Sequence, residues 1–477
     1  MVMRPAKYCQ LFFSAMAADF LSGPKPFLQK VSVKIGRKLQ ESGFRLPAPL
    51  ESVARAGVPD TTSWQDLDDP IFPSVNRQPS DEARVLYFVN SAQPYTVSGY
   101  TVRTQKLLYE VQRNDVAVYP ATRMGYPATI GVVPTQDSVC VDGIRYSLLL
   151  PSRLSLRRGR NRREAINSLV EIARQLDITL LHTTTDFRNA SLISEVAQIL
   201  EIPWIYEVRG ERDRTLEIEN SGKRSRNFLA EFRRRETLAM QAASAVLVLS
   251  EVSRHRVEER GVPGDNIYVV PNGFDRDEAI EAPTKEVARE KIGIPLGTKL
   301  IGTITSVVDY EGLDSLILAL KFLDEDTKAL IVGSGSALPV LQKLAEAKGL
   351  ADRVIFAGKQ APHAIPLWCA ALDVFVLPRR DYEVCRAVTP LKPMLAMGMK
   401  IPVVASDLPA VREATGGLAL YVPPGDPEAL SESIRKALVE PDHFYDHRLE
   451  AFLDTRTWQS SAERLIEAYK ETLLSDA

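Results

Sequence analysis

This chain of 477 residues has few cysteines, no long apolar run and little net charge, and each of these absences excludes a class of protein. Only four cysteines occur, and they form no CxxC motif and no close pair, so we expect free thiols in a reducing cytoplasm. No apolar run reaches the ~20 residues that a membrane-spanning helix needs, and residues 11–21 are too short and contain Asp19. The net charge of −2 provides no overall attraction to nucleic acid.

Motifs for several other chemistries are also missing or incomplete. The five histidines show no metal-ligand spacing, and the three DxD triplets are expected by chance in an acid-rich chain. Gly333-Ser334-Gly335 follows an apolar strand, but Leu338 stands where a dinucleotide-binding GxGxxG motif needs its third glycine. No GxSxG nucleophile motif is present. We therefore expect neither a metal requirement nor a bound cofactor.

The remaining sequence alternates between apolar strands and amphipathic helices, which predicts doubly wound parallel sheets. We expect an N-terminal extension and linker at 1–83, a first Rossmann-like domain at 84–265 and a second at 266–455. A final helix at 456–477 completes the chain. The composition, 45% hydrophobic and 25% charged, is that of an ordinary globular protein.

The most informative segment is Leu372–Glu413, which reads as strand, polar loop, helix, strand and loop. Asp373–Leu377 is a short β-forming run that Pro378 stops, and Lys392 stands between two prolines just before a helical run. Ile401–Ala405 is a second buried strand. This order places a basic polar loop at the carboxyl ends of parallel strands, where nucleotides bind in such folds.

The sequence of that segment resembles the donor segment of GT-B glycosyltransferases of the family 4 type. The resemblance is carried by "VTPLKP" at Val388–Pro393 and "PVVASD" at Pro402–Asp407. Other landmarks follow in the family's order from about Val85 to Leu473. They include "IYEVRGERD" at 205–213, "VVPNGFD" at 269–275, "YEGLDSLILAL" at 310–320 and "VIFAGKQ" at 354–360. The resemblance implies two Rossmann-like domains facing a cleft, and a last helix that crosses back onto the first domain.

The resemblance also implies an activity: transfer of a sugar from a nucleotide-diphosphate donor to an acceptor, with retention of configuration. The first domain is expected to hold a glycan or lipid-linked acceptor, and the second to hold the donor. The leaving nucleotide carries negative charge, which Arg and Lys side chains can stabilise without a metal. Lys392 is our first candidate for the diphosphate and Arg379 the second, and His182 at a predicted strand end completes the catalytic set.

Further candidates follow from the same pattern. Ser98-Gly99 can bring backbone N–H groups close to a phosphate, because glycine permits close approach. On the acceptor side the candidates are Glu207 and Arg209. Arg209 could bind an acidic acceptor or a pyrophosphate-lipid, or could equally form an internal ion pair with Glu207 or Glu211. The remaining donor-binding candidates are Gly358, Lys359, Gln360, Arg386, Val388, Thr389, Pro390, Leu391 and Leu395. For the basic loop residues the alternative is a solvated loop, for Ser98-Gly99 a plain turn, and for His182 a structural role.

The chain departs from the family pattern at Leu395, where relatives carry a glutamate that accepts hydrogen bonds from the ribose. Leucine accepts none, and losing such a contact costs donor binding about 2–3 kcal/mol. Three explanations stay open: Glu383 or Asp381 substitutes, the backbone holds the ribose, or the domain is catalytically silent. The alternative function is therefore a silent GT-B subunit that scaffolds or activates a partner transferase. A nucleotide-sugar epimerase is a third alternative, which the "VTPLKP" wording disfavours.

Two basic segments raise the question of a membrane partner. One contains Arg153, Arg157, Arg158, Arg160, Arg162 and Arg163, and the other contains Lys223, Arg224, Arg226, Arg233, Arg234 and Arg235. Leu154, Leu156, Phe228 and Phe232 make both amphipathic, which is typical of segments that dock on anionic lipid, and residues 25–38 could add a third contact. A solvated charged helix explains them equally well. We expect a cytoplasmic protein, with peripheral attachment to the inner face of the plasma membrane as the open alternative, and no nucleic-acid partner.

Overall fold

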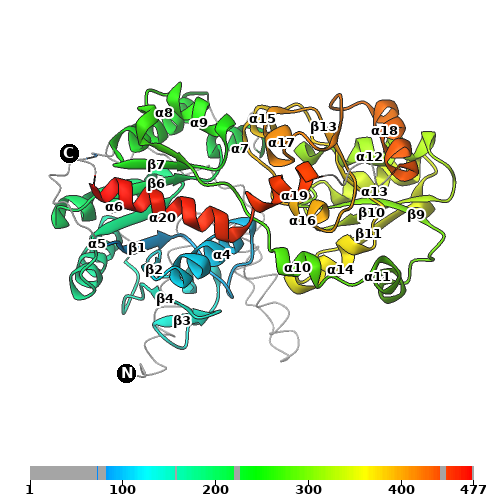
Figure 1. Cartoon of the computed structure of the whole chain (residues 1–477). Helices are drawn as coiled ribbons and strands as arrows, with labels where there is room; N and C mark the ends of the chain where they lie inside the picture. Colours follow the sequence, from blue (N-terminus) through cyan, green and yellow to red (C-terminus); the bar gives the residue numbers. More distant parts are fainter. Residues whose placement is uncertain (1–71, 73–81, 156–157, 220–225, 441–446, 475–477) are drawn as a thin grey trace, which may run out of the picture. The chain divides into compact units, whose positions relative to one another are not determined.

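The computed structural model describes residues 72, 82–155, 158–219, 226–440 and 447–474, which fall into two compact units (Figure 1). Unit 1 comprises 1–247, 265–268 and 465–477, and unit 2 comprises 248–264 and 269–464. The predicted N-terminal extension therefore lies outside the described residues, apart from positions 72, 82 and 83.

Unit 1 is built on an eight-stranded sheet with the strand order β3-β4-β2-β1-β5-β6-β7-β8. Its strands are β1 (Arg84–Val89), β2 (Ala117–Thr122), β3 (Ser138–Val141), β4 (Ile144–Leu148), β5 (Leu180–Thr184), β6 (Trp204–Val208), β7 (Ala245–Val248) and β8 (Ile267–Val269). The strands β4, β2, β1, β5 and β6 pair in parallel, and the edge strand β3 is antiparallel to its neighbour β4. This places the carboxyl ends of β1, β5 and β6 side by side.

Helices cover both faces of this sheet. They are α4 (Gly99–Arg113), α5 (Arg158–Gln175), α6 (Phe187–Leu200), α7 (Arg212–Glu219), α8 (Arg226–Ala242) and the part of α20 (Trp458–Leu474) that belongs to unit 1. Because side chains alternate along a strand, Tyr206 points to α8 while Glu207 points to α4. Helices α4 and α20 therefore share one face with each other, and α6 and α8 share the opposite face.

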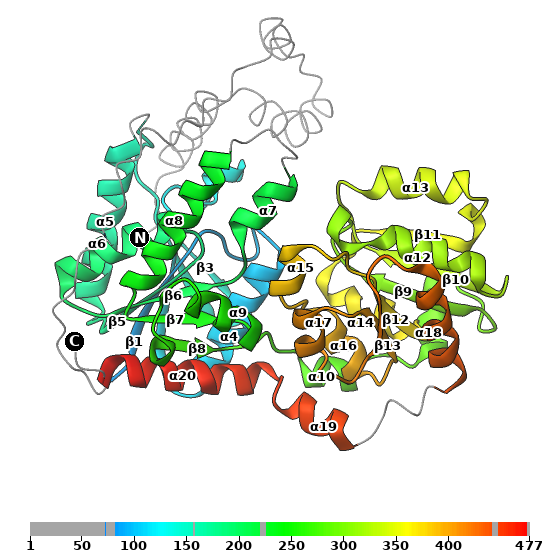
Figure 2. The same cartoon turned by 90° about the horizontal axis from the view of Figure 1, so that it is seen from above.

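Unit 2 contains a six-stranded sheet with the order β11-β10-β9-β12-β13-β14, in which all neighbouring strands are parallel. Its strands are β9 (Lys299–Ile304), β10 (Thr327–Val332), β11 (Val354–Gly358), β12 (Val374–Leu377), β13 (Val403–Ser406) and β14 (Leu420–Val422). Its helices are α9 (Glu251–Glu258), α10 (Arg276–Ile280), α11 (Lys285–Ile292), α12 (Leu313–Ala319), α13 (Leu338–Ala347), α14 (Ile365–Ala370), α15 (Glu383–Ala387), α16 (Pro393–Gly398), α17 (Pro409–Ala414), α18 (Pro427–Val439) and α19 (His447–Asp454). Figure 1 shows α12 and α18 on one side of this sheet and α11 and α14 on the other, and Figure 2 shows the same unit from above.

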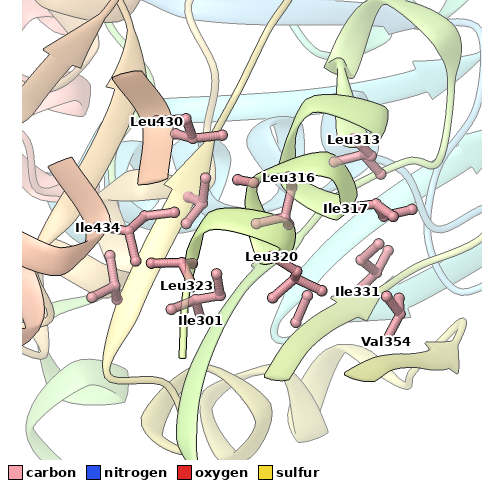
Figure 3. Close-up of a cluster of buried hydrophobic side chains, with 14 of the residues drawn as sticks. Ile301, Leu313, Leu316, Ile317, Leu320, Leu323, Ile331, Val354, Leu430 and Ile434 are labelled. Carbon is pink, nitrogen blue, oxygen red and sulfur yellow. The ribbon is translucent and has the colours of Figure 1, made fainter. Parts of the chain in front are cut away.

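The main core of unit 2 lies between its sheet and the helices α12, α13 and α18 (Figure 3). Leu316 and Ile317 of α12 pack with Ile301 of β9 and Ile434 of α18, and all four side chains are fully buried. Burying each of them stabilises the fold by about 1.5–3 kcal/mol. This core fixes β9 and β12 as the rigid centre of the sheet, and the predicted α/β fold with two doubly wound sheets is confirmed.

Candidate active site

Arg379 follows β12 after one intervening residue, Pro378, and is buried in the loop at the carboxyl end of that strand. Its Nε and Nη2 donate to Glu311 at 3.3 and 3.1 Å, and its Nη1 donates to the Val388 carbonyl oxygen at 2.9 Å. Gly312 makes this possible, because a Cβ on it would lie 2.0 Å from the Pro378 carbonyl oxygen. Arg379 therefore ties the VTPLKP loop to the segment that follows β9.

Lys392 is the residue just before α16, and its side chain reaches the segment after β9 that Arg379 also contacts. Its Nζ donates to Thr305 Oγ1 at 2.6 Å, and Thr305 is the residue that follows β9. Burial lowers the pKa of Lys392, and the nearby Glu311 carboxylate opposes that shift. Among the described residues Thr305 is the only hydrogen-bond acceptor for this ammonium, which has three N–H donors. Two donors therefore remain for a ligand.

Thr305, Glu311, Arg379 and Lys392 form what we call the Lys392 cluster. Burial alone would raise the pKa of Glu311, but Arg379 and Lys392 hold it below its usual range, so Glu311 is ionised. The cluster therefore carries two cations and one carboxylate. A net positive charge in a largely buried site at the carboxyl ends of parallel strands is suited to an anion such as a phosphate.

The other donor-side candidates lie outside the Lys392 cluster. In the VTPLKP loop, Pro390 is buried and Leu391 is half-buried, while the buried Thr389 hydroxyl has no hydrogen-bond partner among the described residues. Leu395 is half-buried on α16. Arg386 is exposed and pairs with Asp381. Gly358 ends β11, and Lys359 and Gln360 follow it; the strands β10 and β9 lie between β11 and β12.

The two acidic residues considered as substitutes for the missing ribose glutamate both have cationic partners. Asp381 accepts from Arg386 at 2.7 Å, and Glu383 accepts from Arg256 of α9 at 3.3 Å. Either carboxylate would have to give up an exposed ion pair to reach a ribose, and such a pair is worth little. The structure thus leaves substitution by either residue open.

In unit 1, the expectation that His182 ends its strand is wrong. β5 continues two residues further to Thr184, and His182 lies in its interior with no exposed surface. Its Nδ1 is 2.8 Å from the Tyr469 hydroxyl of α20, and its Nε2 is 3.6 Å from Glu207. Burial lowers the pKa of His182, so the ring is neutral. The sequence alone does not show whether the strand ends at His182 or at Thr184, because both residues fall in one β-forming run.

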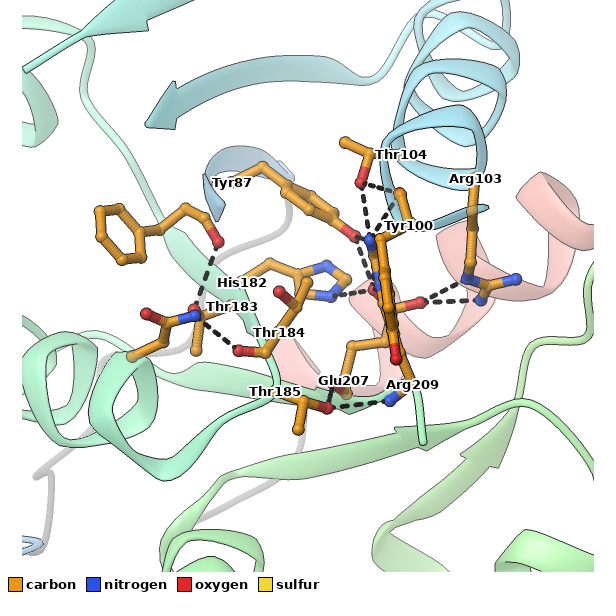
Figure 4. Close-up of polar contacts among 12 residues, drawn as sticks. Tyr87, Tyr100, Arg103, Thr104, His182, Thr183, Thr184, Thr185, Glu207 and Arg209 are labelled. Carbon is orange, nitrogen blue, oxygen red and sulfur yellow. Dashed lines mark hydrogen bonds and ion pairs between the residues drawn. The ribbon is translucent and has the colours of Figure 1, made fainter. Parts of the chain in front are cut away.

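Glu207 is the centre of a buried polar network on the same face of the sheet (Figure 4). It accepts from Arg103 Nε at 2.8 Å, from Arg209 Nε at 2.8 Å and from the Tyr87 hydroxyl at 2.7 Å. Burial would raise the pKa of Glu207, but Arg209 and Arg103 hold it well below its usual range. The open choice between an acceptor contact and an internal pair is thus decided in favour of the pair. Arg103 and Tyr87 come from distant segments and gave no signal in the sequence.

A pocket of about 220 Å³ opens beside this network at the carboxyl ends of β1, β5 and β6. Its wall includes Asn90, Ser91 and Thr184 from the strand ends, and Ser98 and Tyr100 from the start of α4. Ser98 caps α4 by accepting from the Thr101 N–H, and the Thr101 hydroxyl accepts from the Ser98 N–H. Gly99 follows as the first, exposed residue of the helix. The predicted Ser98-Gly99 loop therefore lies at a pocket.

The basic segments are partly neutralised where the structure describes them. Arg162 pairs with Glu195, Arg233 pairs with Asp213, and Arg234 and Arg235 pair with Glu231. Arg153, Arg160 and Arg163 are exposed. Lys223 and Arg224, Arg157, residues 25–38, and the side chains of Leu156, Arg158 and Arg226 lie outside the described part. None of the described helices is both long and apolar enough to cross a bilayer.

Two family models match the chain. One, described as "Glycosyl transferase 4-like domain", matches residues 98–273, and the other, described as "Glycosyl transferases group 1", matches residues 298–440. Together the two matches cover more than half of the sequence.

Curated relatives match over part of their length. Alpha-monoglucosyldiacylglycerol synthase of Streptococcus pneumoniae is 25% identical over 64% of this chain and 69% of its own. The putative teichuronic acid biosynthesis glycosyltransferase TuaC of Bacillus subtilis is 25% identical over 57% of this chain and 65% of its own. The lipopolysaccharide core mannosyltransferase LpsB of Rhizobium meliloti is 35% identical, over 31% of this chain and 43% of its own.

Solved structures match over most of the chain. Sucrose-phosphate synthase of Thermosynechococcus elongatus superposes with a TM-score of 0.63 at 16% identity, over 81% of this chain and 98% of its own. HepE of Anabaena, solved in complex with UDP, gives a TM-score of 0.59 at 16% identity, over 80% of this chain and 98% of its own. At such identities the likeness establishes the fold.

Proposed function

We propose, from the premise that this chain belongs to the GT-B glycosyltransferases of the family 4 type, that it transfers a sugar from a nucleotide-diphosphate donor to a glycan or lipid-linked acceptor. The Lys392 cluster of unit 2 would hold the donor diphosphate, and the pocket of unit 1 would hold the acceptor. The names of the relatives, which include glycolipid and envelope polysaccharide synthases, support a role in building cell-surface glycans. Retention of configuration is part of the proposal and rests on the family alone.

The observation that carries the proposal is the incomplete hydrogen bonding of the Lys392 ammonium. Lys392 is half-buried, and among the described residues its ammonium has a single hydrogen-bond acceptor. Burial disfavours its charged form, which is costly unless an anion joins it when the enzyme binds its substrate. Arg379 adds a second cation close by, and its position is fixed by Glu311. As the bond from the sugar to the diphosphate breaks, negative charge grows on the leaving phosphate. Lys392 would stabilise that charge directly, and Arg379 would do so through its field.

The alternative of a catalytically silent subunit is favoured by one residue, Leu395, which cannot accept a hydrogen bond from a ribose. The charged groups of the Lys392 cluster argue against a silent subunit, because a domain that binds no nucleotide gains nothing from a half-buried, incompletely paired lysine beside a buried arginine. Nucleotide binding separates the two possibilities.

The experiment is a calorimetric titration of the full chain with UDP, GDP and ADP. We expect one nucleotide to bind in the micromolar range, with at least a tenfold loss of affinity in Lys392→Ala. Lys343→Ala, which removes an exposed lysine of α13, is the matched control and should bind like the wild type. If none of the three nucleotides binds, the silent-subunit alternative replaces the proposal. If Lys392→Ala binds normally, the donor site lies elsewhere.

A further inference from the structure

The charged residues of the unit 1 pocket already have protein partners. Arg209 has five N–H donors, and they meet Glu207 Oε2 twice (2.8 and 2.7 Å), the Tyr87 hydroxyl (2.6 Å), the Tyr100 carbonyl (2.9 Å) and Thr104 Oγ1 (2.8 Å). No donor of Arg209 is left for a ligand. The guanidinium is therefore a structural brace of the pocket wall.

The other two charged residues of the wall are engaged as well. Both carboxylate oxygens of Asp186 accept from the Arg188 side chain, and one of them also caps α6 by accepting from the Arg188 N–H. Arg212 is exposed and also has an interaction partner. An anionic ligand would have to displace existing pairs at each of these positions.

The polar groups that remain available are neutral. Asn90, Ser91 and Thr184 line the pocket, and within the described part of the chain their side chains make no hydrogen bond. An amide and two hydroxyls offer both donors and acceptors without charge. That is the complement of a polyhydroxylated ligand, in which each hydroxyl both donates and accepts.

Tyr100 supplies an apolar surface next to these groups. Its side chain is 57% exposed although it lines the pocket, and no ring contact engages it among the described residues. Its backbone is held firmly, because its carbonyl oxygen accepts from Arg209 at 2.9 Å and from the Thr104 hydroxyl at 3.0 Å (Figure 4). The Arg209 brace thus fixes the start of the Tyr100 side chain relative to the end of β6. A ring in that position can stack on the apolar face of a sugar.

We infer that this pocket takes a neutral sugar or cyclitol ring of the acceptor, stacked on Tyr100 and hydrogen-bonded by Asn90, Ser91 and Thr184. The inference rests on the proposed function and names the acceptor's chemical class. It replaces the earlier expectation of an acidic group bound by Arg209. It also assigns Tyr100 as the residue that determines whether a ring can bind.

The test is saturation-transfer NMR of the full chain with methyl α-glucopyranoside, methyl α-mannopyranoside, methyl α-galactopyranoside and myo-inositol, each beside its monophosphate. We expect at least one neutral probe to bind and its phosphate to bind no better. Tyr100→Ala should weaken that probe at least tenfold, whereas Tyr100→Phe should keep it because the ring face is retained. Tyr109→Ala removes a 40% exposed tyrosine of the same helix and is the matched control.

Three results would overturn the inference. They are that no neutral probe binds to the wild type, that Tyr100→Ala binds like the wild type, or that a phosphate binds at least tenfold more tightly than its neutral parent. The third result would point to an acidic acceptor. Nucleotide titration of Tyr100→Ala keeps this test separate from that of the proposed function, because donor binding should be unchanged in the variant. If the wild type binds no nucleotide, the proposed function is refuted, and the glycoside result still decides whether the pocket binds a neutral ring.

Discussion

His182 of β5 and Tyr469 of α20 are hydrogen-bonded inside unit 1, with 2.8 Å between Nδ1 and the hydroxyl oxygen and both side chains fully buried. Their rings also meet edge to face at 5.7 Å between centroids. The contact joins the last helix of the chain to the middle of the unit 1 sheet. The residue chosen from the sequence as catalytic therefore has a structural partner 287 positions away.

Removing that hydroxyl should destabilise the protein without disturbing the donor site. Tyr469→Phe leaves His182 Nδ1 buried without a partner, which costs about 1–3 kcal/mol. Urea unfolding of the variant and the wild type measures the difference. Nucleotide affinity should stay at the wild-type value. An unchanged unfolding midpoint would show that this hydrogen bond does not stabilise unit 1, and a loss of nucleotide affinity would link it to the donor site.

Much of the architecture follows from local patterns in the sequence. Short β-forming runs that end at proline or a polar pair predicted the strands on either side of the VTPLKP loop. One example is the run Asp373–Leu377, where the structure has β12 from Val374 to Leu377. Lys392, placed between two prolines before a helical run, proved to be half-buried beside the buried Arg379. These features depend on neighbours a few residues apart, so a single sequence reveals them.

Contacts between distant segments explain what the sequence could not predict. Arg209 was assigned an acceptor contact or an internal pair, and the choice depended on Arg103 and Tyr87, which lie more than 100 residues before it. The position of His182 within its strand depended on where β5 ends, and nothing in the run from Leu180 to Thr184 marks that point. Pairing across a sheet is decided by the fold as a whole.

Nucleotide binding should depend on pH through Lys392. Burial lowers the pKa of this ammonium, so it loses its proton as the pH rises through that lowered value, and affinity for the diphosphate should fall with it. Titrations between pH 7 and 9.5 avoid protonation of the phosphate. Lys392→Arg keeps its charge over this range, and its affinity should be independent of pH. An equal slope in the variant would assign the titration to another group.

Glu311 should be needed for stability more than for binding. Glu311→Gln leaves the buried Arg379 and the half-buried Lys392 without a carboxylate, which we expect to destabilise the unliganded protein by about 3 kcal/mol. A bound diphosphate supplies the missing negative charge, so the nucleotide should raise the melting temperature of the variant more than that of the wild type. Asp309→Asn, an exposed neighbour, is the control. Equal stabilisation of variant and wild type by nucleotide would place the diphosphate away from Glu311.

Glu236 should make the stability of unit 1 fall with rising pH. Burial and the nearby Asp186 raise the pKa of this carboxyl from 4.5 to about 8. The folded state then holds a proton that the unfolded chain has released, so stability is lost between about pH 4.5 and 8. Glu236→Gln resembles the protonated form, and its amide can still accept from the Phe187 N–H. Urea unfolding at pH 6 and 9 should show a smaller difference in the variant, and an unchanged difference would mean that Glu236 is ionised throughout.

Glu413 should control how firmly the donor loop is held within unit 2. Its two carboxylate oxygens accept from the first N–H groups of α9, those of Glu251 at 2.7 Å and Val252 at 3.0 Å, which have no partner inside the helix. Helix α9 in turn holds the end of α15, just before the VTPLKP loop, because the Ser253 hydroxyl donates to the carbonyl oxygen of Ala387, the last residue of α15, at 3.1 Å.

We expect Glu413→Ala to lower stability by about 1–2 kcal/mol, as loss of a helix cap does, and to weaken nucleotide binding several-fold because the loop is less ordered. Calorimetry and urea unfolding of the same preparation measure both effects, and Glu346→Ala, an exposed glutamate of α13, should change neither. A second variant, Ser253→Ala, keeps the cap and removes only the link to the loop. It should therefore weaken the nucleotide while leaving most of the stability. Normal nucleotide affinity in both variants would show that α9 does not order the loop, and that Arg379 holds it through Val388 alone.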